Sequence, residues 1–211
     1  MSNYPIIVFE GVEGSGKSLH IKNLEKYLKK KNISYQKLRE PGGTKNSEKI
    51  RNLILDKKIN FNRNTDLLLY LAARSENIEL IKKNFKKKVI LIDRFVDSTI
   101  AYQHYGFGVN LKLIKTINKY LIKDIKVNFT FLNVVNQKNM TERLKKRKEL
   151  NRYDKFNKKF YNKVQKGYLK IAKNSRNYQI VNSNLSIRLN KESVIKKIEK
   201  LIRWIFFQLI N

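Results

Sequence analysis

The 211-residue chain has no cysteine and only two histidines, and it contains just two prolines and eight glycines. The missing thiols exclude disulfides, thiolate metal sites and cysteine nucleophiles. His20 and His104 are too few for the usual zinc clusters. No apolar run approaches the roughly 20 residues that span a bilayer, and residues 1–4 show neither the basic segment nor the cleavage site of a secretory signal. We therefore expect a cytoplasmic protein without a membrane partner.

Acidic residues are scarce, with 17 Asp and Glu against 47 Lys and Arg, which gives a net charge of +30. Such an excess can indicate a nucleic-acid-binding surface. However, Lys greatly outnumbers Arg, and the abundant Asn, Ile, Tyr and Phe share A- and T-rich codons, so a strongly AT-biased genome would produce this composition in any protein. The lysines are also dispersed over many predicted helices. We expect no specific nucleic-acid partner, although the charge attracts polyanions such as nucleotides.

Short apolar runs of strand length alternate with longer segments of helical period, and no linker rich in Pro, Gly or Ser separates them. The runs predict strands at residues 6–10, 34–39, 89–92, 127–134 and 178–181. The longer segments predict helices at residues 19–30, 47–55, 65–85, 140–148, 156–173 and 191–209. This alternation is typical of an α/β fold, in which helices cover both faces of a parallel sheet. We expect a single domain over residues 1–211, with ligands beyond the carboxyl ends of the strands.

A glycine-rich turn follows the first predicted strand and matches the pattern G-x-x-x-x-G-K-[ST] in full. Its residues are Gly11, Val12, Glu13, Gly14, Ser15, Gly16, Lys17 and Ser18. The glycines let backbone N–H groups converge on phosphate oxygens, and the N-terminus of the next helix adds further donors. Lys17 can reach the β- and γ-phosphates, and the Ser18 hydroxyl can bind Mg²⁺. The position between an apolar strand and an amphipathic helix predicts a nucleoside-triphosphate site rather than a chance turn.

Arginines near predicted strand ends indicate what receives the phosphoryl group. Residues 132–135 lack the Asn-Lys-x-Asp segment with which a GTPase reads guanine. Arginine makes two-point contacts with phosphate, and arginine is conspicuous in a chain that so strongly prefers lysine. The pattern favours a kinase that acts on a small molecule.

Four motifs, in order, resemble those of the thymidylate kinase family. They are Arg-Glu-Pro-Gly-Gly-Thr at 39–44, Leu-Ala-Ala-Arg at 71–74, Asp-Arg-Phe at 93–95 with the segment 97–103, and Glu-Leu-Asn-Arg-Tyr-Asp at 149–154. The resemblance runs from about residue 6 to residue 182. It implies a P-loop NTPase-type, five-stranded parallel sheet flanked by helices, with a small lid at about residues 145–155. It also implies transfer of the γ-phosphate of ATP to dTMP with Mg²⁺, for dTTP synthesis, by a homodimer.

The resemblance further implies roles for individual residues. Arg51 and Arg94 would grip the dTMP phosphate, and Asp93 with Ser18 would order Mg²⁺. Glu13 would approach the sugar 3′-hydroxyl. The thymine pocket and the loop beneath the acceptor would comprise Glu40, Tyr70, Arg74, Ser98, Tyr102 and Gln103, with Tyr70 in place of the family's usual phenylalanine. Arg147 and Arg152 would swing in with the lid and neutralise charge on the transferring group, because the phosphate loop carries no arginine.

Several alternatives stay open at this point. Arg51, Arg74, Arg147 and Arg152 can also be solvated residues on helices, and Ser98 and Tyr102 can be ordinary loop and core residues. The whole chain can be a kinase for another monophosphate or for a deoxynucleoside, a P-loop protein that binds nucleic acid, or a regulator that binds nucleotide without turnover. The combination of Arg74, Gln103 and Arg94 favours a pyrimidine monophosphate.

Overall fold

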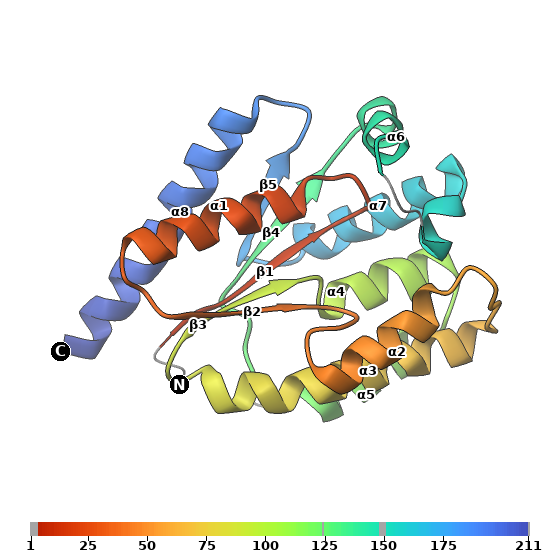
Figure 1. Cartoon of the computed structure of the whole chain (residues 1–211), viewed down its shortest axis with the longest axis horizontal. Coiled ribbons are helices and arrows are strands. Elements are labelled where there is room, and N and C mark those ends of the chain that lie inside the picture. Colours follow the sequence, from red (N-terminus) through yellow and green to blue (C-terminus); the bar gives the residue numbers. More distant parts are fainter. Residues whose placement is uncertain (1–3, 124, 148–150, 211) are drawn as a thin grey trace.

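The structure is a computed structural model that describes residues 4–123, 125–147 and 151–210 (Figure 1). Its five strands form one parallel sheet, in the spatial order β2-β3-β1-β4-β5. The strands are β1 (Ile6–Gly11), β2 (Tyr35–Arg39), β3 (Val89–Asp93), β4 (Phe129–Val134) and β5 (Tyr178–Asn182). The α/β fold with five parallel strands is therefore confirmed. None of the described helices is long and apolar enough to cross a membrane.

Helices cover both faces of the sheet, and alternate side chains of β1 show how. Ile7 and Phe9 are buried against α1 (Lys17–Lys30) and α8 (Ile187–Ile210), which lie together on one face (Figure 1). Ile6 and Val8 point to the other face, where α3 (Arg63–Asn84) packs. Every residue of β1 is buried, so its carboxyl end is a rigid support for the phosphate loop that follows.

The remaining helical elements lie between successive strands of the chain. They are α2 (Lys45–Leu55), α4 (Val96–Thr99), the π-helical segment η1 (Ile100–Gly106), α5 (Leu111–Ile122), α6 (Gln137–Lys145), the 3₁₀ turn η2 (Arg152–Lys155) and α7 (Lys158–Lys173). The α2 and α3 helices pack against each other, as do α7 and η1. The acceptor side of the cleft described below lies among these elements.

Capping residues explain the main differences from the predicted boundaries. The helix predicted to begin at residue 140 begins at Gln137, because the Asn136 side chain accepts a hydrogen bond from the Asn139 N–H. The last helix begins at Ile187 rather than 191, after Ser186, whose hydroxyl accepts from the Leu189 N–H. The helices between residues 96 and 122 were not predicted.

Candidate active site

The phosphate loop lies where the sequence predicted it, between the end of β1 and the start of α1. Gly11, Gly14 and Gly16 have φ angles of 142°, 69° and 88°, which favour glycine over residues with a side chain. A Cβ atom added at Gly11 would lie 2.4 Å from the Asn133 carbonyl oxygen. The loop therefore requires glycine here for space as well as for conformation.

Lys17 is buried beneath this loop, and its ammonium group donates hydrogen bonds to two loop carbonyls. Its Nζ atom lies 2.9 Å from the Gly11 oxygen and 3.0 Å from the Val12 oxygen. Burial, together with the nearby charge of Arg94, lowers the pKa of Lys17 to about 8. An anion in the loop would favour the charged form of Lys17 and repay part of its desolvation.

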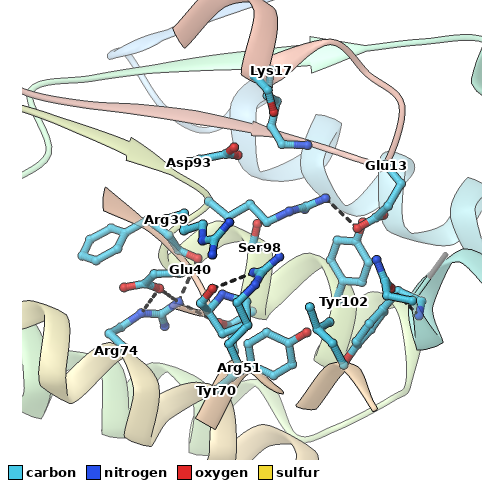
Figure 2. Close-up of a pocket in the computed structure, with 18 of the residues that line it drawn as sticks. Glu13, Lys17, Arg39, Glu40, Arg51, Tyr70, Arg74, Asp93, Ser98 and Tyr102 are labelled. Carbon is cyan, nitrogen blue, oxygen red and sulfur yellow. Dashed lines mark hydrogen bonds and ion pairs between the residues drawn. The ribbon is translucent and has the colours of Figure 1, made fainter. Parts of the chain in front are cut away.

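One cleft at the carboxyl ends of the strands collects nearly all the predicted side chains. Figure 2 shows Lys17, Asp93 and Glu13 on one side of it, and Arg74 and Tyr70 on the other. The predicted residues that line it are Glu13, Lys17, Ser18, Glu40, Arg51, Tyr70, Arg74, Asp93, Arg94, Ser98, Tyr102, Gln103 and Arg147. Of the predicted side chains beyond the phosphate loop, all of which the structure describes, Arg152 alone is outside this lining.

Arg94 lines the cleft and has an unusual backbone conformation. Its φ angle is 69°, which few residues other than glycine adopt. Its Nη2 atom donates to Glu13 at 2.7 Å, and its guanidinium carbon lies 5.2 Å from the centre of the Tyr102 ring. The second carboxylate oxygen of Glu13 accepts from the Tyr102 hydroxyl. Arg94 is therefore held at several points before any ligand binds.

The Glu13 carboxyl is kept ionised by the cations around it. Burial alone would raise its pKa, but Arg94 and Lys17 hold the pKa of Glu13 below its usual range. A negative side chain at this position lies between the phosphate loop and Arg94. It balances two cations that would otherwise repel each other.

Arg74 is part of the cleft wall rather than a solvated residue, since only 1% of it is exposed. It donates to Glu40 at 2.8 Å, to Asn118 at 2.5 Å, and to the Phe95 carbonyl and the Thr99 hydroxyl at 2.9 Å each. A guanidinium has five N–H groups, so at most one remains for a ligand. Arg74 thus ties α3 to the loop that contains Glu40 and to α4, and at most one of its N–H groups is left for a ligand.

Gln103 has a buried amide nitrogen that is available to a ligand. The residue is 1% exposed, it lines the cleft, and its buried Nε2 atom has no partner among the described residues. A buried donor without a partner costs free energy, so a ligand acceptor atom would stabilise it. The Tyr70 ring lines the same cleft and packs edge-on against Tyr153 with 6.1 Å between ring centres.

Oxygen ligands for a divalent cation are present near the phosphate loop. The buried Oδ1 atom of Asp93 has no partner among the described residues, and Asp93 and Ser18 both line the cleft. Carboxylate and hydroxyl oxygens suit Mg²⁺, which usually needs only one or two protein ligands beside substrate phosphates and water. The described residues hold no cluster of three or more His, Cys, Asp or Glu. The donor set therefore fits a nucleotide-bound Mg²⁺ rather than a permanent metal centre.

The two predicted lid arginines have different partners. Arg152 pairs with Asp66 of α3, and its guanidinium carbon lies 5.1 Å from the Tyr153 ring centre. Arg147 lines the cleft, its side chain is 42% exposed, and it forms an ion pair with Asp154 at 2.8 Å. Residues 148–150, which include the Glu149 and Leu150 of the lid motif, lie outside the described residues.

Sequence reasoning missed several residues that shape the site. Glu10 and Tyr168 support Arg94, and Asn118 and Thr99 hold Arg74. Arg143 of α6 donates to the Gly14 carbonyl at 3.0 Å and to the Ser183 carbonyl at 2.7 Å, and so joins the phosphate loop to the loop after β5. An acidic residue at the end of an apolar strand was the one available signal for Glu10. The other partners come from distant parts of the chain.

A phosphate loop that faces an arginine-lined acceptor pocket defines a P-loop kinase for a small phosphorylated acceptor. The family profile described as thymidylate kinase matches residues 9–194. A thymidylate kinase of Thermosipho africanus is 37% identical over 198 residues, which cover 93% of this chain and 96% of that protein. One from Kosmotoga olearia is 31% identical, with 90% and 93% covered. The crystal structure of thymidylate kinase from Ehrlichia chaffeensis aligns with a TM-score of 0.75 at 30% identity, covering 92% of this chain and 98% of that one.

The chain therefore belongs to the thymidylate kinase family. It is an enzyme that transfers the γ-phosphate of ATP to dTMP and forms dTDP.

Proposed function

We propose that the dTMP phosphate binds between Arg94 and Arg51, with the thymine ring between Tyr70 and Gln103. The observation that carries this proposal is the Arg94 guanidinium, held in the cleft by Glu13 and stacked near Tyr102. Arg51 lines the same cleft and donates to the Pro41 carbonyl at 2.7 Å, which leaves other N–H groups for a ligand. Two guanidinium groups offer the planar, two-point donors that a phosphate dianion accepts.

The cleft performs phosphoryl transfer mainly by alignment and charge neutralisation. The transition state is loose, so little covalent chemistry falls to the protein. The acceptor is already an anion and needs no strong general base, which agrees with a cleft lining without histidine among the described residues. Lys17 would neutralise the β- and γ-phosphates, and Arg94 would hold the acceptor in line. Mg²⁺, when bound by Ser18 and Asp93, would add further charge neutralisation at the phosphates.

Measurement of ADP release with a panel of acceptors tests the assignment of the pocket. We expect the highest kcat/KM for dTMP among dTMP, dUMP, UMP, CMP, AMP and GMP. Loss of the thymine methyl should cost roughly tenfold or more, because one methyl in an apolar pocket contributes about 1–3 kcal/mol. Faster turnover of AMP or GMP would show that the acceptor base is assigned wrongly. No turnover of any acceptor would favour a regulator that only binds nucleotide.

We further propose that Arg147, rather than Arg152, supplies the lid charge. Arg147 is half-exposed in the cleft and paired with one carboxylate, whereas Arg152 is already paired with buried Asp66. An Arg147→Ala variant should lose on the order of 10–100-fold in kcat. Its KM for dTMP should change little, because a contact made only in the transition state contributes little to ground-state binding.

Arg152→Ala is the matched control in the same steady-state assay. It removes an equal charge from the same lid, yet it should lower kcat less and lower the Tm instead, because it leaves Asp66 buried without its cation. If both variants keep kcat within about twofold of wild type, the lid is a passive cover. A larger kcat loss in Arg152→Ala would reverse the assignment.

A homodimer remains a proposal drawn from the family resemblance. Its support in the structure is apolar surface on two helices that pack together, α3 and α5. Leu68 of α3 is 56% exposed, and Leu113 and Tyr120 of α5 are also exposed. The single-domain organisation, the cytoplasmic location and the absence of a specific nucleic-acid partner also stay predictions.

A further inference from the structure

We propose that Glu10 is a positioning residue for the dTMP phosphate, because it holds the turn that carries Arg94 and the hydroxyl groups that support the Arg94 guanidinium. Glu10 is not expected to touch either substrate. The inference rests on the proposed grip of Arg94 on the acceptor phosphate, and it adds a residue from β1 to the machinery of that grip.

Glu10 is fully buried next to the last residue of β1, and both its carboxylate oxygens are occupied. Oε1 accepts from the backbone N–H of Phe95 at 2.8 Å and from that of Ser98 at 3.2 Å. Oε2 accepts from the Ser98 hydroxyl at 2.5 Å and from the Tyr168 hydroxyl at 3.2 Å. A buried carboxylate with four donors around it is a fixed element of the structure, because the loss of any partner leaves charge uncompensated.

The backbone contacts of Glu10 fix the turn in which Arg94 lies. Helix α4 begins at Val96, and Phe95 at its N-cap position has no side chain that could cap it. Glu10 of β1 performs this role, since its Oε1 atom accepts the N–H of Ser98, the third residue of the helix, as well as that of Phe95. The Arg94 N–H donates to the Phe9 carbonyl at 3.0 Å, so β1 holds both neighbouring amides. The left-handed conformation of Arg94 persists only if its surroundings determine it, and these contacts do so.

The side-chain contacts of Glu10 determine the direction of the hydroxyl protons. Arg94 Nη1 donates to the Tyr168 hydroxyl at 3.3 Å and to the Ser98 hydroxyl at 3.4 Å, so both oxygens must accept. The two hydroxyls also lie 2.6 Å from each other. Each hydroxyl has one proton. The Ser98 proton points to Glu10, and the Tyr168 proton points to Glu10 or to the Ser98 oxygen, so neither proton points to the guanidinium. Glu10, the two hydroxyls and Arg94 thus form one connected network.

The charges around Glu10 bear on the choice of substitution. Burial and the nearby Asp97 carboxylate raise the pKa of Glu10 to about 7, against the lowering effect of the Ser98 and Phe95 hydrogen bonds and of Arg94. Asp97 itself accepts from the Tyr178 hydroxyl. A buried carboxylate with a raised pKa costs desolvation energy, so a neutral group of the same shape should be tolerated by the fold. Glu10→Gln is therefore the variant to test.

Glu10→Gln places an amide donor where a carboxylate oxygen accepts. If the new amide NH2 group faces the Phe95 N–H, two donors meet without an acceptor. If it faces the hydroxyl groups of Ser98 and Tyr168, the protons of these hydroxyls turn toward Arg94. In either case the guanidinium loses its support. Steady-state kinetics of the full chain should show a KM for dTMP raised roughly tenfold or more, as for loss of a charged hydrogen bond. The KM for ATP should stay within about twofold, because the phosphate loop keeps its contacts.

Asp97→Asn is the matched control, because it removes a nearby, partly buried carboxylate on α4 while leaving the contacts of Glu10 to the turn. Its KM for dTMP should stay within about threefold of wild type. Equal effects of the two variants would mean that Glu10 acts only on general stability. If Glu10→Gln does not fold, Tyr168→Phe tests the same network, and it should raise the KM for dTMP by a smaller factor.

A double-mutant cycle with Arg94→Lys separates this inference from the function on which it rests. If Glu10 acts through Arg94, Glu10→Gln should have little further effect on the KM for dTMP once Arg94 is changed. Additive effects would overturn the inference. If Arg94→Lys raises the KM for dTMP and Glu10→Gln does not, only the inference fails. If Arg94→Lys itself leaves that KM unchanged, the proposed role of Arg94 is wrong.

Discussion

Lys17→Ala should lower kcat by on the order of 10²–10³-fold or more, as expected for loss of a preorganised charge at the transferring group. The Lys17 ammonium is buried against the Gly11 and Val12 carbonyls, so it already lies inside the loop that would hold the phosphates. Its removal leaves the charge on the β- and γ-phosphates uncompensated. It also leaves two loop carbonyls without their donor. ADP release at saturating ATP and dTMP measures the effect.

Lys22→Ala provides the control for this experiment. Lys22 lies on the same helix but is exposed to solvent, and its removal changes the net charge by the same amount. We expect turnover within about twofold of wild type for this variant, since surface substitutions usually have small effects. Near wild-type ADP formation by Lys17→Ala would refute the assignment of the phosphate loop.

Arg94→Lys should raise the KM for dTMP by about 10- to 100-fold although it conserves the charge. Hydrogen bonds to charged groups contribute about 1.5–3 kcal/mol, and a compact ammonium cannot make the planar two-point contact of a guanidinium. Arg94 uses separate nitrogen atoms for Glu13 and for the Ser98 and Tyr168 hydroxyls. Lysine has a single side-chain nitrogen and cannot bind these partners through separate atoms. Arginine and lysine have the same conformational cost at a φ of 69°, so the exchange tests the side chain alone.

The KM for ATP tests whether Arg94 binds dTMP rather than ATP. We expect it to change by less than about threefold in Arg94→Lys, because the phosphate loop and Lys17 are untouched. Arg188→Lys is the matched control, since the Arg188 side chain is 84% exposed on α8 and should tolerate the same exchange. A raised KM for ATP with an unchanged KM for dTMP would move Arg94 to the nucleotide-donor side.

The elements that the sequence predicted well are those whose signal is contiguous. The phosphate loop occupies eight consecutive residues, and its position between an apolar strand and a helix is itself local information. The central strands β1, β3 and β4 were recognised because buried parallel strands are nearly continuous apolar runs, whereas the edge strands β2 and β5 are more polar and only partly buried. The boundaries moved where a capping side chain, such as that of Asn136, lies ahead of the apolar pattern.

Residue type and family motif singled out Arg74 and Arg152 but left their partners open. Arg74 reaches Glu40, which is 34 residues away, and Asn118, which is 44 residues away. Arg152 pairs with Asp66 across 86 residues. A side chain's free hydrogen-bonding capacity depends on which groups surround it in space, and periodicity along the chain contains no information about that.

The sequence by itself thus determined the fold class, the phosphate loop and several of the arginines that line the cleft. The tertiary structure alone decided where these groups lie and what they contact. Arg74 is buried in the cleft wall and Arg147 lines the cleft. Arg152 pairs with Asp66 of α3, and Glu10 accepts the backbone N–H of the residue after Arg94. The physical reason is that backbone preferences act over a few neighbouring residues. The protonation, orientation and availability of a buried polar group are set by partners that only folding brings within hydrogen-bond distance.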